Sequence, residues 1–358
     1  MLDEVGQIEK IDRSNMRGIL KNFPGQCEEA VKMADNLPLP AFSQEEINRV
    51  VICGLGGSAI GGDILRTLFC KVKTTIHVNR NYFLPSFVNE KTVVLVTSYS
   101  GNTEETISSF KQALQKGCLI FAISSGGELE KLSKQKGIHH LKVPGGMPPR
   151  CAVGYLTIPM IKLLEKILRV KLFNYKELVD VLGKLSERYH PEIKTENNFT
   201  KQMALKLKGK IPLIYGVDGL TDVVAHRWKT QFNENSKILA SWNTFPEMNH
   251  NEVVPWSGEG EIDLNLFYPI FLRDKAELRR ISKRIEITQD LIKEKGVEYS
   301  EIWTEGECLL SRIFSLIYTG DWISFYLAIS QSVDPTPIKF IELLKNELKK
   351  FTSSGEGT

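Results

Sequence analysis

The chain has 358 residues, of which 42% are hydrophobic and 25% charged. Its length predicts two domains, and its composition is that of an ordinary globular protein. Lys and Arg total 46 against 43 Asp and Glu, and this net charge of +3 is too small to indicate nucleic-acid binding. The first residues carry acids instead of an apolar run, and about 18 uninterrupted apolar residues, enough for a membrane span, occur nowhere. We therefore expect a cytoplasmic protein without a signal peptide or a membrane segment.

Cysteines and histidines show no spacing typical of a metal site. The six cysteines are far apart, which predicts buried, reduced thiols and no disulfide framework: Cys27, Cys53, Cys70, Cys118, Cys151 and Cys308. His139 and His140 are adjacent, so on a strand their rings point to opposite faces. The other histidines are scattered: His77, His190, His226 and His250. No metal and no other cofactor is expected.

The first part of the chain alternates strand and helix patterns. Short β-branched or apolar runs predict strands over 49–54, 75–78, 92–97, 119–124 and, more weakly, 139–143. Amphipathic patterns predict helices over 14–36, 59–70, 103–115 and 127–136. Such alternation is typical of a parallel sheet covered on both faces. It predicts a first domain over residues 1–150.

A second series follows two prolines at 148 and 149. Helices over 154–170 and 175–189 are expected to bridge the halves, and a polar tail over 352–358 is expected to be disordered. Between them the pattern predicts strands over 211–216, 237–240, 263–272 and 297–303, with helices over 221–233, 275–295, 307–329 and 336–350. The predicted fold is therefore α/β, with two doubly wound, flavodoxin-like parallel-sheet domains, the second over residues 151–358.

The first candidate binding loop follows the strand at 49–54. Five glycines surround Ser58 between Gly54 and Asp63, ahead of a predicted helix. Free N–H groups and the positive dipole end of a helix favour an anion there, and glycines such as Gly57 let a ligand approach the backbone. A dinucleotide loop is an alternative, but the spacing is not G-x-G-x-x-G and the next strand ends at Asn79, not at an acid. A purely structural turn remains a second alternative.

The second candidate loop follows the strand at 92–97. Ser98, Ser100 and Thr103 crowd Gly101 just before a predicted helix. Hydroxyls and N-terminal amides together form a phosphate cup that needs no cation. Helix capping is the alternative, and it accounts for Thr103 alone. Both loops follow parallel strands at the edge where open α/β sheets bind ligands, so we predict a phosphate site made by both. Its residues are Gly57, Ser58, Ser98, Ser100 and Thr103.

At these residues the chain resembles a known family. The loop at Ser58 and the segment 98–106 resemble the sugar isomerase (SIS) domain, a phosphosugar-binding module. Four further segments resemble the bifunctional phosphoglucose/phosphomannose isomerase family, over essentially the whole chain: 148–150, 232–235, 246–252 and 334–339. The resemblance implies two SIS domains, a homodimer with active sites at domain and subunit junctions, and a sugar-phosphate substrate. It also implies metal-free interconversion of fructose 6-phosphate with glucose 6-phosphate, mannose 6-phosphate or both.

The chemistry defines the roles that these segments must fill. Moving a carbonyl between C1 and C2 requires a base, a group near the developing oxyanion and an acid or base that opens the sugar ring. By resemblance, Glu234 is the base and Arg150 stabilises the negative charge. His250 opens the ring, and Lys339 assists ring opening or holds sugar oxygens. From the residues alone, each remains open to a plainer interpretation as a charged or polar surface side chain.

Two other classes of protein remain open. A non-catalytic phosphosugar sensor requires only the phosphate cup, which makes Glu234, His250 and Lys339 incidental. An aminosugar synthase carries a glutaminase domain with an N-terminal cysteine, and Met1-Leu2 does not offer one. The sequence does not decide between glucose and mannose epimers.

Overall fold

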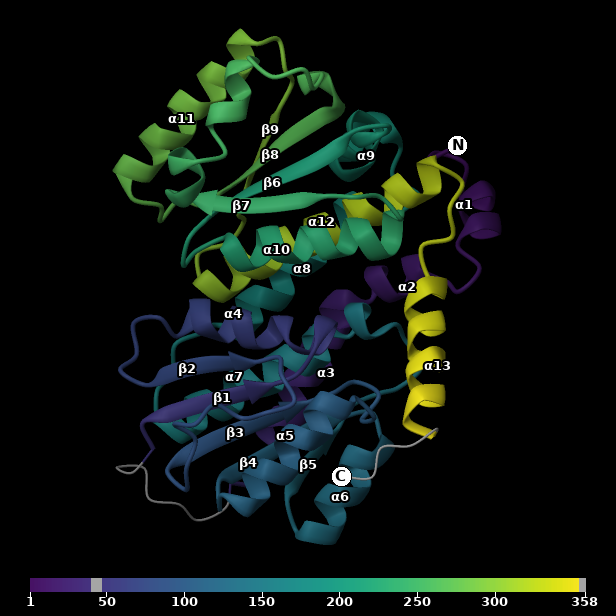
Figure 1. Ribbon diagram of the computed structural model, residues 1–358. Helices are drawn as coiled ribbons and strands as arrows, with labels where there is room; N and C mark the ends of the chain where they lie inside the picture. Colours follow the sequence, from purple (N-terminus) through teal and green to yellow (C-terminus); the bar gives the residue numbers. More distant parts are fainter. Residues whose placement is uncertain (40–46, 354–358) are drawn as a thin grey trace.

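The computed structural model describes residues 1–39 and 47–353 and contains two parallel sheets, one above the other in Figure 1. The first sheet has the order β2-β1-β3-β4-β5 and the second β7-β6-β8-β9, with every pairing parallel. The first sheet contains β1 (Arg49–Cys53), β2 (Thr75–Asn79), β3 (Thr92–Thr97), β4 (Leu119–Ser124) and β5 (His139–Lys142). The second contains β6 (Ile211–Val217), β7 (Ser241–Phe245), β8 (Phe267–Arg273) and β9 (Ser300–Trp303). The predicted α/β fold with two parallel sheets is confirmed.

Helices cover both faces of each sheet because the strands are apolar on both sides. In β1, Val50 and Ile52 face the core between the two sheets, whereas Val51 and Cys53 face an outer core. The outer core of the first sheet is closed by α5 (Glu104–Gln115) and α6 (Gly127–Lys136). The outer core of the second sheet is closed by α11 (Arg279–Glu294). Successive side chains of a strand point to opposite faces of the sheet, so each strand contributes to both cores.

The remaining long helices lie between the two sheets or beside them (Figure 1). They are α4 (Ile60–Leu68), α7 (Val153–Leu168), α8 (Tyr175–Tyr189), α9 (Phe199–Leu207), α10 (Asp222–Gln231) and α12 (Leu309–Ser330). Together with the N-terminal helices α1 (Val5–Ile11), α2 (Met16–Lys21) and α3 (Phe23–Asp35) they share one continuous apolar core. The last helix, α13 (Lys339–Ser353), runs along the side of the molecule in Figure 1.

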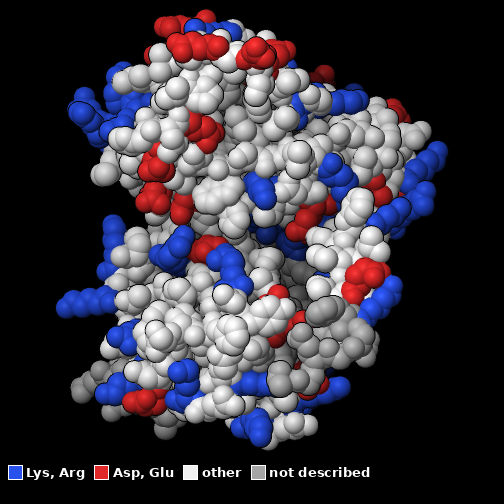
Figure 2. All heavy atoms as spheres, in the orientation of Figure 1, with Lys and Arg blue, Asp and Glu red and all other residues white. Residues whose placement is uncertain are grey.

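The N-terminal helices contact elements from both predicted domains. α3 packs against α7 and α8, and α2 packs against α12. The two halves also meet through α4 and α10, where Arg66 lies 3.7 Å from Asp222. Figure 2 shows a hollow between the halves with basic and acidic side chains along it. The domain boundary at residue 150 stays a prediction.

Several predicted elements differ from the structure. The predicted helix 14–36 is two helices that meet at Asn22, and α1 and α9 were not predicted. The strand predicted at 237–240 is wrong, because β7 begins at Ser241. Lys237 has a left-handed conformation (φ 56°) that ends the preceding turn, and the carbonyl of Ile238 accepts a hydrogen bond from the Asn233 side chain at 2.8 Å. The strand predicted at 263–272 begins only at Phe267.

One helix, α12, is long and apolar enough to cross a membrane by length and composition, and its apolar stretch is buried within the protein.

All six cysteines are free, as expected, but Cys70 is exposed and Cys308 half-buried, so the expectation of buried thiols is wrong for these two. Residues 352 and 353 end α13, and the rest of the predicted disordered tail lies outside the described residues.

Candidate active site

The two candidate phosphate loops lie at the carboxyl ends of the neighbouring strands β1 and β3. The Ser98 Oγ and Thr103 Oγ1 atoms are 2.8 Å apart. Thr103 occupies the N-cap position of α5, yet its side chain makes no capping hydrogen bond. Ser58 Oγ accepts a hydrogen bond from the backbone N–H of Tyr99 at 3.1 Å, which joins the two loops. The hydroxyls that the sequence singled out are therefore brought together ahead of the α5 N-terminus.

The second loop depends on Gly101. Its φ of 70° is the left-handed conformation that glycine adopts freely, and an added Cβ would lie 1.8 Å from the carbonyl oxygen of Gly126. The turn leaves Ser100 exposed, where its Oγ accepts a hydrogen bond from the N–H of Asn102 at 3.3 Å. Ser100 is thus open to a ligand, whereas Ser98 is buried below it.

Gly57 connects the first loop to Arg150. A Cβ added at Gly57 would lie 3.1 Å from both the Arg150 Cα and the Pro149 carbonyl oxygen, so glycine permits this close approach. Arg150 lies in a short 3-10 helix, η3 (Pro149–Cys151), which follows β5 at the same edge of the first sheet. The predicted phosphate and catalytic residues therefore touch at this point.

The Arg150 side chain is 3% exposed and reaches into the second half of the molecule. Its Nη1 lies 3.3 Å from Glu234 Oε2, and its Nε donates to Asn235 Oδ1 at 2.6 Å. Its Nη2 donates to the carbonyl oxygens of Pro335 and Thr336 at 2.8 and 3.0 Å. One guanidinium group, with its fixed array of donors, thus holds three segments of the chain together.

A buried ion pair between Arg227 and Asp321 contacts the backbone of Arg150. Arg227 Nη2 donates to the Arg150 carbonyl oxygen at 2.9 Å and pairs with Asp321 at 2.8 Å. Burial raises the pKa of Asp321, and the nearby Arg227 charge opposes that shift. Gln231 also donates to Asp321 Oδ1 at 2.8 Å. The backbone of Arg150 is therefore fixed by α10 and α12, and its side chain is fixed by η5 and by the turn at 335–336.

Glu234 lies on η5 (Phe232–Ser236), a π-helical turn that continues α10. Asn235 Nδ2 donates to Ser324 Oγ at 3.0 Å, and Ser236 Oγ donates to the Ser324 carbonyl oxygen at 2.7 Å. These bonds fix the turn against α12, whereas the Glu234 side chain stays 27% exposed. π-helical turns are frequent at functional sites. Here the turn presents a carboxylate that is both anchored and accessible.

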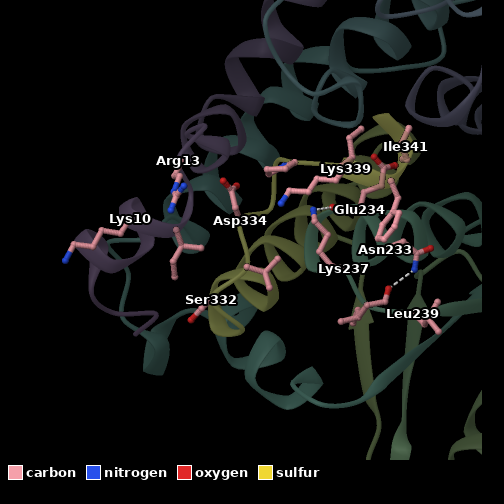
Figure 3. A pocket seen from close by; sticks show the side chains of 16 residues that line it. Lys10, Arg13, Asn233, Glu234, Lys237, Leu239, Ser332, Asp334, Lys339 and Ile341 are labelled. Atoms are coloured by element: carbon pink, nitrogen blue, oxygen red, sulfur yellow. Dashed lines mark hydrogen bonds between the residues drawn. The ribbon is translucent and has the colours of Figure 1, made fainter. Parts of the chain in front are cut away.

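Glu234 and Lys339 line a common pocket of about 920 Å³ between α1, η5 and the start of α13. Figure 3 shows Lys10 and Arg13 on the side formed by α1, with Glu234, Lys237 and Lys339 facing them from the other side. A carboxylate at the edge of a cationic pocket can take up a proton while positive charge stabilises an adjacent oxyanion. The structure thus brings Arg150, Glu234 and Lys339 together.

His250 is not brought to this pocket. It is exposed on η6 (Glu247–His250), which follows β7, whereas Glu234 precedes β7. The strand between them has five residues and spans roughly 16 Å at about 3.3 Å per residue. Asn249 Nδ2 donates to Thr288 Oγ1 on α11 at 3.0 Å, which holds this segment at the far end of β7. The described part of the pocket lining does not include His250.

Sequence reasoning did not find Lys237. Its ammonium group donates to the carbonyl oxygen of Glu234 and, at 3.0 Å, to that of Pro335. Partial burial, followed by the charge of Arg150, lowers the pKa of Lys237 to about 8. A lysine after two asparagines and a serine carries no recognisable signal, since its role depends on a turn about a hundred residues away.

Comparisons with known proteins identify the family of the chain. Residues 196–348 match the family model "Bacterial phospho-glucose isomerase C-terminal SIS domain". A bifunctional phosphoglucose/phosphomannose isomerase from Caldicellulosiruptor bescii is 44% identical, over 92% of this chain and 98% of its own. A D-glucosamine-6-phosphate 4-epimerase from Sulfolobus acidocaldarius is 31% identical, over 71% of this chain and 77% of its own.

The fold is also found among solved structures. The crystal structure of a hypothetical protein from Thermus thermophilus superimposes with a TM-score of 0.77 at 14% identity, covering 96% of this chain and 94% of its own. At that identity the likeness concerns the fold alone. The sequence match to the C. bescii protein extends over nearly the full length of both chains. The chain therefore belongs to the bifunctional phosphoglucose/phosphomannose isomerase family.

Proposed function

We propose that the protein interconverts fructose 6-phosphate with glucose 6-phosphate, mannose 6-phosphate or both, by metal-free proton transfer through an enediol. The observation that carries this proposal is the position of Arg150. Its backbone contacts the phosphate loop at Gly57, and its guanidinium group contacts Glu234 at 3.3 Å. A sugar whose phosphate occupies the loops is thereby directed toward a carboxylate base with a cation beside it.

Each side chain has a role in the proposed reaction. The hydroxyls of Ser58, Ser98, Ser100 and Thr103 and the N–H groups ahead of α4 and α5 bind the 6-phosphate. Glu234 removes the proton from C2 of the aldose or C1 of the ketose and returns it to the other carbon. The Arg150 guanidinium and the Lys339 ammonium stabilise the enediolate oxygen, and Lys339 also holds sugar oxygens.

A homodimer completes the site in this proposal, because His250 and Glu234 lie at opposite ends of β7 in one chain. The partner subunit supplies the histidine that opens the ring. Charge supports this arrangement. Residues 247–263 contain five acids and no Lys or Arg, whereas Lys10 and Arg13 line the pocket. Exposed apolar side chains on α13, namely Phe340, Leu343 and Leu344, offer further surface for a partner.

Hybrid dimers test the shared site. A dimer of one Glu234→Gln chain and one His250→Ala chain, isolated with two different tags, contains one site with both lesions and one intact site. By two-fold symmetry we expect about half of the wild-type activity from this hybrid, although each homodimer is nearly inactive. A hybrid as inactive as its parents would place both residues in the same subunit's site.

The activity itself is tested by product analysis. Purified protein is incubated with fructose 6-phosphate, and the products are separated into glucose and mannose 6-phosphates. Formation of either aldose supports the isomerase, and the ratio gives the epimer preference. Binding of sugar phosphate without turnover would favour the non-catalytic sensor. We also place the protein in the cytoplasm, where its free thiols stay reduced; cell fractionation checks this.

A further inference from the structure

Lys237 joins two segments that carry catalytic candidates. It is the residue directly after the π-helical turn, and its ammonium group donates to the carbonyl oxygen of Glu234 within that turn. The same ammonium group donates to the Pro335 carbonyl oxygen at 3.0 Å. Pro335 is buried in the turn that connects α12 to α13. Lys237 thus connects the backbone at Glu234 to the segment that leads to Lys339.

Two cations share the Pro335 carbonyl oxygen. Arg150 Nη2 donates to it at 2.8 Å from one side, and Lys237 Nζ donates to it at 3.0 Å. A carbonyl oxygen has two lone pairs, so it accommodates both donors. Hydrogen bonds from charged donors are stronger than those between neutral groups. The turn at Pro335 accepts two of them, so its position is fixed relative to both Arg150 and Glu234.

We propose that Lys237 is a positioning residue: it holds the Glu234 turn and the 335–339 segment in the arrangement that lets the carboxylate and Lys339 act on one substrate. This inference rests on the proposed isomerase function. Lys237 acts through the backbone of other residues, because its hydrogen bonds are to main-chain carbonyl oxygens. The phosphate loops lie in the other half of the molecule, so we expect binding of the phosphate group to depend little on this residue.

The charge of Lys237 makes this role dependent on pH. Burial and the Arg150 charge lower the pKa of Lys237 to about 8, against the opposite effect of Asp334 and Glu234. Below this pH the ammonium group has three donors; above it, the neutral amine loses its charge-assisted bonds. The support of Lys237 is therefore lost as the pH rises through about 8. The other titratable groups that line the described part of the pocket are Lys10 on α1, Arg13 just after α1, and Lys339 at the start of α13.

Three variants test the proposal. Lys237→Met removes the donors, Lys237→Arg keeps a charge that does not titrate in this range, and Lys229→Met is the matched control. Lys229 is on α10, outside the pocket lining, and no described residue forms a hydrogen bond or ion pair with its side chain. We expect Lys237→Met to lower kcat by about 10- to 100-fold with little change in KM, as loss of one or two charged hydrogen bonds implies. Lys229→Met stays at wild-type kcat.

The pH profile separates positioning from a general structural effect. Wild-type kcat should fall above about pH 8, and the Lys237→Arg variant should retain its activity to higher pH. A wild-type kcat in Lys237→Met, or an equal loss in Lys229→Met, would overturn the proposal. Amide hydrogen exchange over residues 334–341 is independent of turnover and should be faster in Lys237→Met than in the wild type. If the wild type shows no isomerase activity but amide exchange is faster in Lys237→Met, the proposed isomerase function is rejected and the positioning role of Lys237 is kept. Unchanged amide exchange in Lys237→Met would reject the positioning role.

Discussion

The carboxyl edge of the first sheet and the amino edge of the second sheet are built in different ways. At the first edge, the hydroxyls lie within the segment 58–103 and bond to each other or to adjacent backbone. At the second edge, Arg150 bonds to partners that are 84 to 186 residues away in sequence. The candidate phosphate site is therefore local in sequence, whereas the candidate catalytic group forms only after both halves have packed together.

This difference predicts a division of effects. Substitutions in the phosphate loops remove contacts that the bound substrate keeps throughout the reaction, so they should act on KM. Substitutions around Glu234 remove groups that are needed as charge develops in the transition state, so they should act on kcat. The kinetic experiments below test whether effects on KM and on kcat separate in this way.

The largest effect is expected for Glu234→Gln. The amide keeps the shape of the side chain and its hydrogen-bonding capacity but not the basicity of the carboxylate. General-base catalysis typically contributes about 10²–10⁴-fold, so kcat should fall by that factor while KM changes little. Steady-state kinetics with fructose 6-phosphate measures both quantities.

Glu301→Gln is a suitable comparison for that variant. Glu301 on β9 accepts hydrogen bonds from Arg273 and Gln289, and it is not among the described residues that line the pocket. A loss of kcat in Glu301→Gln as large as in Glu234→Gln would indicate a general effect on the second half of the molecule. A normal kcat in Glu234→Gln would place the base elsewhere.

A smaller effect, on KM, is expected in the phosphate loops. Ser100→Ala and Thr103→Val each remove a hydroxyl, and a hydrogen bond to a charged group is worth about 1.5–3 kcal/mol. KM should therefore rise by about 10- to 100-fold for each variant, with kcat retained. Ser108→Ala, on the same helix, should leave KM unchanged, because its hydroxyl bonds to the Tyr82 carbonyl oxygen. An unchanged KM in both loop variants would exclude this loop as the phosphate site.

Ser58→Ala should affect stability as well as binding. Ser58 Oγ accepts a hydrogen bond from the buried backbone N–H of Tyr99, and Ser58→Ala leaves that N–H without this partner. The unpaired group should lower the free energy of unfolding by about 1–3 kcal/mol, measurable by urea denaturation. Equal stability of variant and wild type would mean that another acceptor replaces the hydroxyl, and that the loops are not joined by this bond.

No effect is expected from removal of metal. Among the described residues there is no group of three or more His, Cys, Asp and Glu side chains arranged to hold a metal ion. Dialysis against a strong chelator should leave kcat and KM at their original values. Loss of activity that zinc or magnesium restores would overturn the metal-free mechanism.

Most of the fold could be predicted from the sequence, because the pattern there is local. The strand β3 follows from its short, continuous β-branched run, and the helix α6, predicted at 127–136 and found there, follows from its amphipathic pattern. The pattern places β7 four residues too early, since Ile238–Ala240 is apolar while the true edge strand is largely exposed. No pattern distinguishes the short helices α1 and α9 from loop.

The candidate site divides in the same way. Glycines and hydroxyls after strands indicate a phosphate loop by elementary chemistry, and the structure brings those residues together. Glu234 and Lys339 are identified by resemblance, because a lone carboxylate or a lysine at a helix start has no signature. The structure brings these residues together with Arg150 through contacts between α10, α12 and η3. The π-helical turn and the proposed role of Lys237 depend on the same contacts. Contacts between segments so far apart in the chain leave no pattern in a single sequence, so they could not be predicted from it.

The most direct test of the account follows the hydrogen at C2 of glucose 6-phosphate in deuterated water. If Glu234 is the base, the wild-type protein should exchange this hydrogen with solvent deuterium during isomerisation, and Glu234→Gln should not. His250→Ala should retain the exchange on substrate whose ring is already open. Exchange at a near-normal rate in Glu234→Gln would contradict the account, because the proton would then be carried by another group.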